Sequence, residues 1–126
     1  MEHRITIKVY YEDTDSLGVV YYANYLKYLE RARTELIDAA GKPIQRWNGD
    51  GFNFAVYQLK IKFLQPARLG DVCEVVTTVA SCSEYRRVLR QVIERDGEVI
   101  TEASVDLVCL DAELTLREFP ADAIPA

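Results

Sequence analysis

Two aspartates, two positions apart, are the residues of this sequence best suited to catalysis. Asp13 and Asp15 lie in an acidic segment that is followed by Gly18 and then by the most regular helical pattern of the chain. The N-terminus of a helix carries unpaired N–H groups and a partial positive charge, which stabilise a developing anion. A carboxylate beside it acts as a general base or as a nucleophile. The structural alternative is that both aspartates only shape a turn.

Composition narrows the range of functions. The chain has 126 residues and a net charge of −5, which argues against a nucleic-acid-binding protein. It has one histidine, His3, and three cysteines, Cys73, Cys82 and Cys109, without C-x-x-C spacing. We therefore expect no metal site, and we expect the cysteines to be buried as small hydrophobic residues. Without a signal peptide or an apolar run near ~20 residues, we expect a cytoplasmic protein with no stable membrane insertion.

A strand and a long helix are predicted to position the aspartates. Alternation over residues 5–11 predicts a half-buried strand directly before the acidic segment. The 3.6-residue period predicts a helix over residues 22–40, which Gly41 and Pro43 end. The apolar face of this helix is predicted to contain Leu26, Leu29, Leu36, Ile37 and Ala40.

Arg33 falls among the apolar positions of the predicted helix and has two interpretations. Its side chain either reaches solvent at the edge of the apolar face or pairs with Asp13 or Glu12 and orders the acidic segment. The second interpretation would make Arg33 part of the candidate site.

The remainder of the chain is predicted to form antiparallel strands. The predicted strands are residues 52–63, 72–81, 85–94 and 99–110. A phase slip at Tyr57–Gln58 indicates a β-bulge, and Asp96–Gly97 indicates a hairpin turn. Residues 114–119 are expected to form a short edge strand, and the tail from about residue 120 to 126 is expected to fray. We therefore predict one α+β domain over residues 1–126, with five or six strands around one helix.

Residues 14–25 resemble the signature of the 4-hydroxybenzoyl-CoA thioesterase family of hotdog-fold proteins. The shared pattern is aspartate, two variable residues, glycine, two aliphatic residues, four residues and an aromatic residue. The continuation over residues 26–35 resembles the acyl-CoA thioesterase subgroup often found beside Tol-Pal cell-envelope genes. The resemblance implies a hotdog fold, in which a curved antiparallel sheet wraps around one long central helix. It also implies a homodimer or homotetramer with active sites at the dimer interface, as apolar residues on both faces of strand 85–94 also suggest.

The resemblance implies roles for three residues of the acidic segment and the helix start. Asp15 would be the catalytic carboxylate, acting as nucleophile or as general base, and the backbone N–H of Tyr22 would polarise the thioester carbonyl. Gly18 would let the backbone pass close to the substrate. The Tol-Pal-associated subgroup usually has histidine at the position of Tyr22, whereas the hydroxybenzoyl-type enzymes have tyrosine. A backbone donor survives this change, but a histidine-assisted role does not.

The expected function is hydrolysis of an acyl-CoA to free acid and CoA, without a metal or cofactor because CoA belongs to the substrate. Candidates for binding the CoA phosphates are the basic residues Lys60, Lys62, Arg68, Arg86, Arg87 and Arg90. Arg86 and Arg87 point to opposite faces of their strand, so at most one of them serves a given site. Tyr25, Val56 and Tyr57 are candidates for the acyl pocket.

Two other functions remain open on the same fold. A hydratase or dehydratase acting on acyl thioesters needs a histidine beside the acid, and the chain offers only His3. A non-catalytic or weakly catalytic protein would bind an acyl thioester or an acyl carrier protein, although the presence of Asp15 argues against this.

Overall fold

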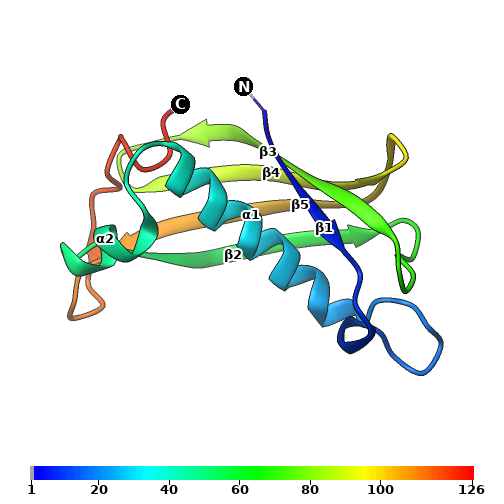
Figure 1. The fold of residues 1–126 in the computed structure, drawn as a ribbon. Coiled ribbons are helices and arrows are strands. Elements are labelled where there is room, and N and C mark those ends of the chain that lie inside the picture. Colours follow the sequence, from blue (N-terminus) through cyan, green and yellow to red (C-terminus); the bar gives the residue numbers. More distant parts are fainter. Residues whose placement is uncertain (1) are drawn as a thin grey trace.

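The computed structural model describes residues 2–126 and contains the predicted antiparallel sheet, with six strands, and one long helix on one face (Figure 1). The strands are β1 (His3–Lys8), β2 (Asn53–Phe63), β3 (Val72–Cys82), β4 (Arg86–Arg95), β5 (Glu98–Leu110) and β6 (Leu116–Arg117). The helices are α1 (Tyr25–Ala39) and α2 (Ile44–Gly49), and short 3-10 turns span Tyr11–Asp13 and Tyr22–Asn24.

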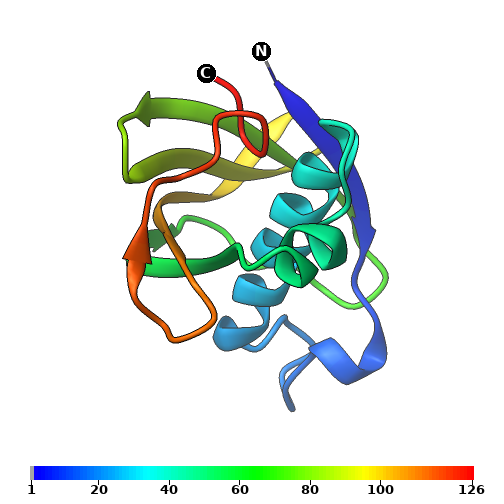
Figure 2. The ribbon, with the colours of Figure 1, turned by 90° about the vertical axis from the view of Figure 1, so that its left-hand side faces the viewer.

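The sheet has the strand order β1-β3-β4-β5-β2, with β6 paired to β5. Figure 2 shows that it curves around α1. The predicted bulge is present, because the register of β2 against β5 shifts between Val56 and Gln58. The predicted hairpin is also present, and Asp96 and Gly97 have φ values of 54° and 79°, as a type I′ turn requires. Among residues 2–126, strand β2 pairs with β5 alone, and no strand covers its other edge.

Helix α1 buries part of the predicted face, with Leu29 and Ile37 buried and Leu36 half-buried, but two tyrosines also enter the core. The buried residues are Tyr25, Tyr28, Leu29, Ala32 and Ile37. Leu26 is 41% exposed and Ala40 is also exposed, so the prediction for these two residues was wrong. The physical reason is that a tyrosine buries its ring as a hydrophobic group when its hydroxyl finds a hydrogen-bond partner. Two tyrosines therefore displace Leu26 from the core.

Arg33 does not pair with the acidic segment, so that interpretation was wrong. Its Nη1 donates to Gln91 Oε1 at 3.1 Å. Gln91 is fully buried and its Nε2 donates to the Leu29 carbonyl at 3.1 Å and to Thr77 Oγ1 at 3.0 Å. Arg33 lies eight residues after Tyr25, about 12 Å along the helix axis. This network joins the middle of α1 to the centre of the sheet.

The C-terminal tail packs on the sheet and does not fray as predicted. Phe119, Ala123 and Ile124 are buried. Arg87, itself 5% exposed, donates from Nε to the Ile124 carbonyl at 2.8 Å and from Nη1 to the Ser83 carbonyl at 2.7 Å. The tail therefore forms one wall of the core.

Cysteine placement agrees with the prediction at two of three positions. Cys73 and Cys109 are buried, but Cys82 at the end of β3 is exposed. Within residues 2–126, no group of three or more histidine, cysteine, aspartate or glutamate side chains is arranged to hold a metal ion. None of the helices in this range combines the length and apolarity needed to cross a bilayer.

Candidate active site

The acidic segment leads into a tight loop, residues 14–20, which we call the acidic loop. Inside it the Asp15 N–H donates to the Val19 carbonyl at 2.9 Å, and the Gly18 N–H donates to the Asp15 carbonyl at 3.1 Å. Gly18 has a φ of 76°, which favours glycine. The half-buried Asp15 side chain accepts the Leu17 N–H at Oδ1, at 2.8 Å. Its Oδ2 receives no hydrogen bond from residues 2–126, so it is available to a substrate or a water molecule.

A second segment, residues 67–69, forms backbone hydrogen bonds with the acidic loop. The Val20 N–H donates to the Ala67 carbonyl at 2.8 Å, and the Leu69 N–H donates to the Gly18 carbonyl at 3.1 Å. Residues 67–69 follow β2 in the chain, so the loop is fixed against the end of the sheet as well as against the helix.

Tyr22 begins the 3-10 turn that runs directly into α1. No acceptor for the Tyr22 N–H is found among the described residues, as expected for the first N–H groups of a helical segment. The Tyr22 ring is 63% exposed and lies 5.0 Å from the Tyr21 ring and 6.4 Å from the Phe63 ring, measured between centroids. The acidic loop, which carries Asp15, therefore lies at the same end of α1 as the turn that presents the free Tyr22 N–H (Figure 1).

A hollow of about 290 Å³ opens at the same end of α1. It is lined by Val20, Tyr22, Tyr25, Phe63, Leu64, Gln65 and Pro66. Tyr25 is buried, with its ring 5.2 Å from that of Phe63, and its hydroxyl accepts the Ala67 N–H at 3.0 Å. Burial raises the pKa of the Tyr25 phenol, so this residue stays neutral at physiological pH. The largely apolar lining suits the acyl or pantetheine part of a thioester.

The predicted basic residues separate into two groups. The Arg87 side chain is buried and donates to the Ile124 carbonyl of the C-terminal tail, so a phosphate group cannot reach its guanidinium. Arg86 forms an ion pair with Asp106 and lies over the Tyr57 ring, 5.2 Å from its centroid. Arg68 is exposed on the segment that pairs with the acidic loop.

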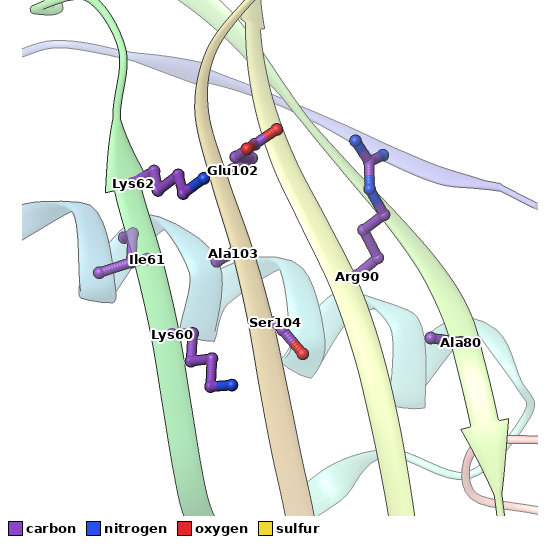
Figure 3. Close-up of a pocket in the computed structure, with 8 residues that line it drawn as sticks. All are labelled: Lys60, Ile61, Lys62, Ala80, Arg90, Glu102, Ala103 and Ser104. Carbon is purple, nitrogen blue, oxygen red and sulfur yellow. The ribbon is translucent and has the colours of Figure 1, made fainter.

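Three other basic residues lie on the face of the sheet opposite α1 (Figure 3). Lys60 and Lys62 on β2 and Arg90 on β4 line a broad hollow together with Ser104 and Glu102 on β5. Figure 3 shows both lysine side chains extending toward β5. The three cations share this hollow with the Glu102 carboxylate and the Ser104 hydroxyl, and their positive charge outweighs the negative charge of the one acid, which favours phosphate groups.

Val56 and Tyr57 are not brought to the hollow within one chain. Both are exposed at the bulge of β2, six to seven residues before Phe63, a distance of about 20 Å along a strand. Sequence reasoning missed two parts of the site, the Phe63 ring in the hollow and the segment at Ala67 that bonds to the acidic loop. Phe63 was assigned only to an alternating strand, and no local signal marks its contact with Tyr25.

Comparison with known proteins identifies the family. A sequence model of the thioesterase-like superfamily matches residues 9–125. The acyl-CoA thioester hydrolase YbgC of Escherichia coli O6:H1 is 36% identical over 109 residues, which cover 86% of this chain and 81% of that protein. The acyl-CoA thioesterase YbgC of Haemophilus influenzae is 35% identical over 106 residues, covering 83% and 78%.

Solved structures support the same assignment. A hypothetical protein from Thermus thermophilus matches with a TM-score of 0.90 at 34% identity, covering 97% of this chain and 94% of that one. A probable thioesterase from Bartonella henselae matches with a TM-score of 0.91 at 27% identity, covering 95% and 100%. The predicted hotdog fold and the predicted relation to the Tol-Pal-associated subgroup are therefore confirmed. The chain belongs to the thioesterase-like superfamily.

Proposed function

We propose that this chain is an acyl-CoA thioesterase, which hydrolyses an acyl-CoA to the free acid and CoA. The observation that carries the proposal is the pairing of Asp15, with one free carboxylate oxygen, and the free Tyr22 N–H at the same end of α1. The names of the YbgC relatives, acyl-CoA thioester hydrolase and acyl-CoA thioesterase, support this substrate class. An acyl-CoA substrate also agrees with the cytoplasmic location expected from the sequence.

The two groups have complementary tasks in thioester hydrolysis. Acting as a base, Asp15 takes a proton from water, and the water oxygen attacks the thioester carbon. Acting as a nucleophile, Asp15 attacks that carbon itself and forms an anhydride that water then hydrolyses. In either route the carbonyl π electrons move to oxygen, and the Tyr22 N–H stabilises the oxyanion. Collapse of the intermediate breaks the carbon–sulfur bond and releases CoA as a thiolate, which then takes up a proton.

Substrate binding is divided between the two faces of the sheet. The hollow around Tyr25 and Phe63 receives the part of the substrate next to the thioester. Lys60, Lys62 and Arg90 bind the CoA phosphates on the opposite face, in preference to Arg86, whose charge Asp106 balances. Arg87 is left out of the proposed site because its side chain is buried.

A second copy of the chain completes the site. The free edge of β2 is 11 residues long and exposes Val56, Tyr57 and Phe63 along it, and Leu26 is exposed on α1. Long apolar edge strands are normally covered. If two β2 edges pair about a two-fold axis, the first half of each strand lies beside the second half of the other. Val56 and Tyr57 then approach the partner's hollow, where they can form part of the acyl pocket. We expect a dimer or tetramer by light scattering at micromolar concentration, and a monomer would contradict a shared site.

The deciding experiment measures CoA release from a panel of short-chain, long-chain and aromatic acyl-CoAs. We expect hydrolysis of at least one member, and a loss of at least about 100-fold in kcat for Asp15→Asn, the scale of a lost catalytic base. If the wild-type chain binds these acyl-CoAs but hydrolyses none, the non-catalytic binding function replaces the proposed one. If Asp15→Asn keeps full activity, Asp15 loses its role.

A further inference from the structure

Of the two aspartates, Asp13 is the buried one, at 6% exposure. Its Oδ2 accepts the Tyr28 hydroxyl at 2.8 Å and the Tyr10 N–H at 2.9 Å. Its carbonyl oxygen accepts the Tyr21 N–H at 3.0 Å and Asn24 Nδ2 at 2.9 Å. Asp13 is the last residue before the acidic loop, so these four bonds fix the point at which the loop begins.

The opposite side of the acidic loop is anchored by a second tyrosine. Residues 67–69 pair with the loop, and the Tyr25 hydroxyl accepts the Ala67 N–H at 3.0 Å. Tyr25 and Tyr28 are three positions apart and project from the same face of α1. Their rings meet edge to face, with centroids 6.2 Å apart, and the two residues are 3% and 1% exposed. Two hydroxyls on adjoining turns of one helix therefore hold both sides of the loop.

The side chains of Tyr25 and Tyr28 have little freedom to move. A buried phenol has few side-chain torsions, and a hydroxyl that donates to a carboxylate forms a stronger hydrogen bond than one between neutral groups. Burial and the hydrogen bond to Asp13 raise the pKa of the Tyr28 phenol, so the donor stays protonated. Any movement of Asp13 reaches Asp15, which follows it by two residues. A displacement near 1 Å at a catalytic group costs up to ~100-fold in rate.

We propose that Tyr28, through Asp13, and Tyr25, through Ala67, are positioning residues that set the Asp15 carboxylate relative to the Tyr22 N–H. This inference rests on the proposed thioesterase function. It gives the two aspartates different tasks, with Asp15 reacting and Asp13 holding the loop. It also divides the role of Tyr25, whose ring lines the hollow while its hydroxyl anchors the loop.

The first test replaces Tyr28 by Phe, which removes one hydroxyl and keeps the ring. We expect kcat for acyl-CoA hydrolysis to fall ~10- to 100-fold, while KM stays within ~3-fold because no substrate contact is lost. Tyr25→Phe is expected to give the same separation of kcat from KM. Tyr85→Phe is the matched control, because Tyr85 is 42% exposed and its hydroxyl makes no hydrogen bond among residues 2–126. An unchanged kcat in Tyr28→Phe would overturn the proposal.

A double variant separates positioning from general damage to the fold. If Tyr28 acts only through Asp15, adding Tyr28→Phe to Asp15→Asn lowers the residual kcat by less than ~2-fold. A further ~10-fold loss in that background would mean that the tyrosine acts by another route, and would overturn the proposal. Asp15→Asn alone tests the proposed function, so failures of the two claims give different results.

A third pair of variants keeps the test valid if Tyr28→Phe folds poorly. Asp13→Asn retains an oxygen that accepts from Tyr28 and from the Tyr10 N–H but loses the charge, so we expect its kcat to fall by less than that of Asp13→Ala. Asp13→Ala removes the acceptor and is expected to lose as much activity as Tyr28→Phe. Equal activity of Asp13→Asn and Asp13→Ala would contradict the role of this hydrogen bond.

Discussion

Gly18 allows a quantitative test of the acidic loop. Its φ is 76°, and a Cβ added there meets no atom within 4 Å, so an alanine would be strained by its backbone conformation alone. The left-handed region costs an L-residue ~1–2 kcal/mol, and alanine recovers ~0.4–1 kcal/mol by restricting the unfolded chain. The net destabilisation then lies between ~0 and ~1.6 kcal/mol, with a midpoint of ~0.8 kcal/mol. With an unfolding entropy near 2.1 cal/mol/K per residue, about 0.26 kcal/mol/K for 126 residues, this midpoint lowers Tm by ~3 °C.

Gly97 supplies the matched control for Gly18→Ala. Its φ is 79°, its Cβ position is also open, and it lies in the turn between β4 and β5. We expect calorimetry to show similar falls in Tm for Gly18→Ala and Gly97→Ala. Only Gly18→Ala should lower kcat, by ~10-fold, because Gly18 bonds to the Asp15 carbonyl and its strain moves the loop. Equal kcat values for the two variants would refute this reasoning.

Two further predictions concern the network at Gln91 and the ion pair at Asp71. Gln91→Leu leaves the Arg33 guanidinium without its acceptor, so urea titration should show that the free energy of unfolding falls by ~1–3 kcal/mol. Adding Arg33→Met to Gln91→Leu should restore part of this loss, because the unpaired charge is then removed. Strictly additive losses would contradict this coupling. The second prediction concerns the Asp71 carboxyl. Burial alone would raise the pKa of Asp71, but hydrogen bonds from the Arg68 N–H and from Arg95 hold this pKa below its usual value. The ionised carboxylate therefore stabilises the fold above about pH 4 and loses this effect as the pH falls through the folded-state pKa. Asp71→Asn should lower Tm at pH 7 but much less near pH 2, and an equal fall at both would contradict it.

Local signals in the sequence predicted the order of elements well. Alternating hydrophobicity located the long strands, the phase slip at Tyr57–Gln58 located the bulge, and Asp96–Gly97 located the hairpin. Each of these features depends on a few neighbouring residues, which pattern analysis sees directly. The family signature added the expected role of Asp15, which residue types and spacing alone did not distinguish from that of Asp13.

The features that sequence analysis missed depend on contacts between distant residues. Arg33 bonds to Gln91, 58 positions away, and Arg87 bonds to the Ile124 carbonyl, 37 positions away. No local pattern announces either pair. The burial of Tyr28 on α1 was missed for a related reason, since its hydroxyl finds its acceptor in Asp13, 15 positions away. The charged and aromatic residues were thus the hardest to place, because their burial depends on a partner.

The central claim is that Asp15 performs the chemistry of thioester hydrolysis. The most direct measurement is kcat of Asp15→Asn for CoA release from the best acyl-CoA of the panel, beside Asp13→Asn as the control that also neutralises one carboxylate. We predict a loss of at least about 100-fold for Asp15→Asn and a clearly smaller loss for Asp13→Asn, whose amide oxygen still accepts from Tyr28, with both variants as folded as wild type by circular dichroism. Comparable activity in Asp15→Asn and the wild-type chain would contradict the account.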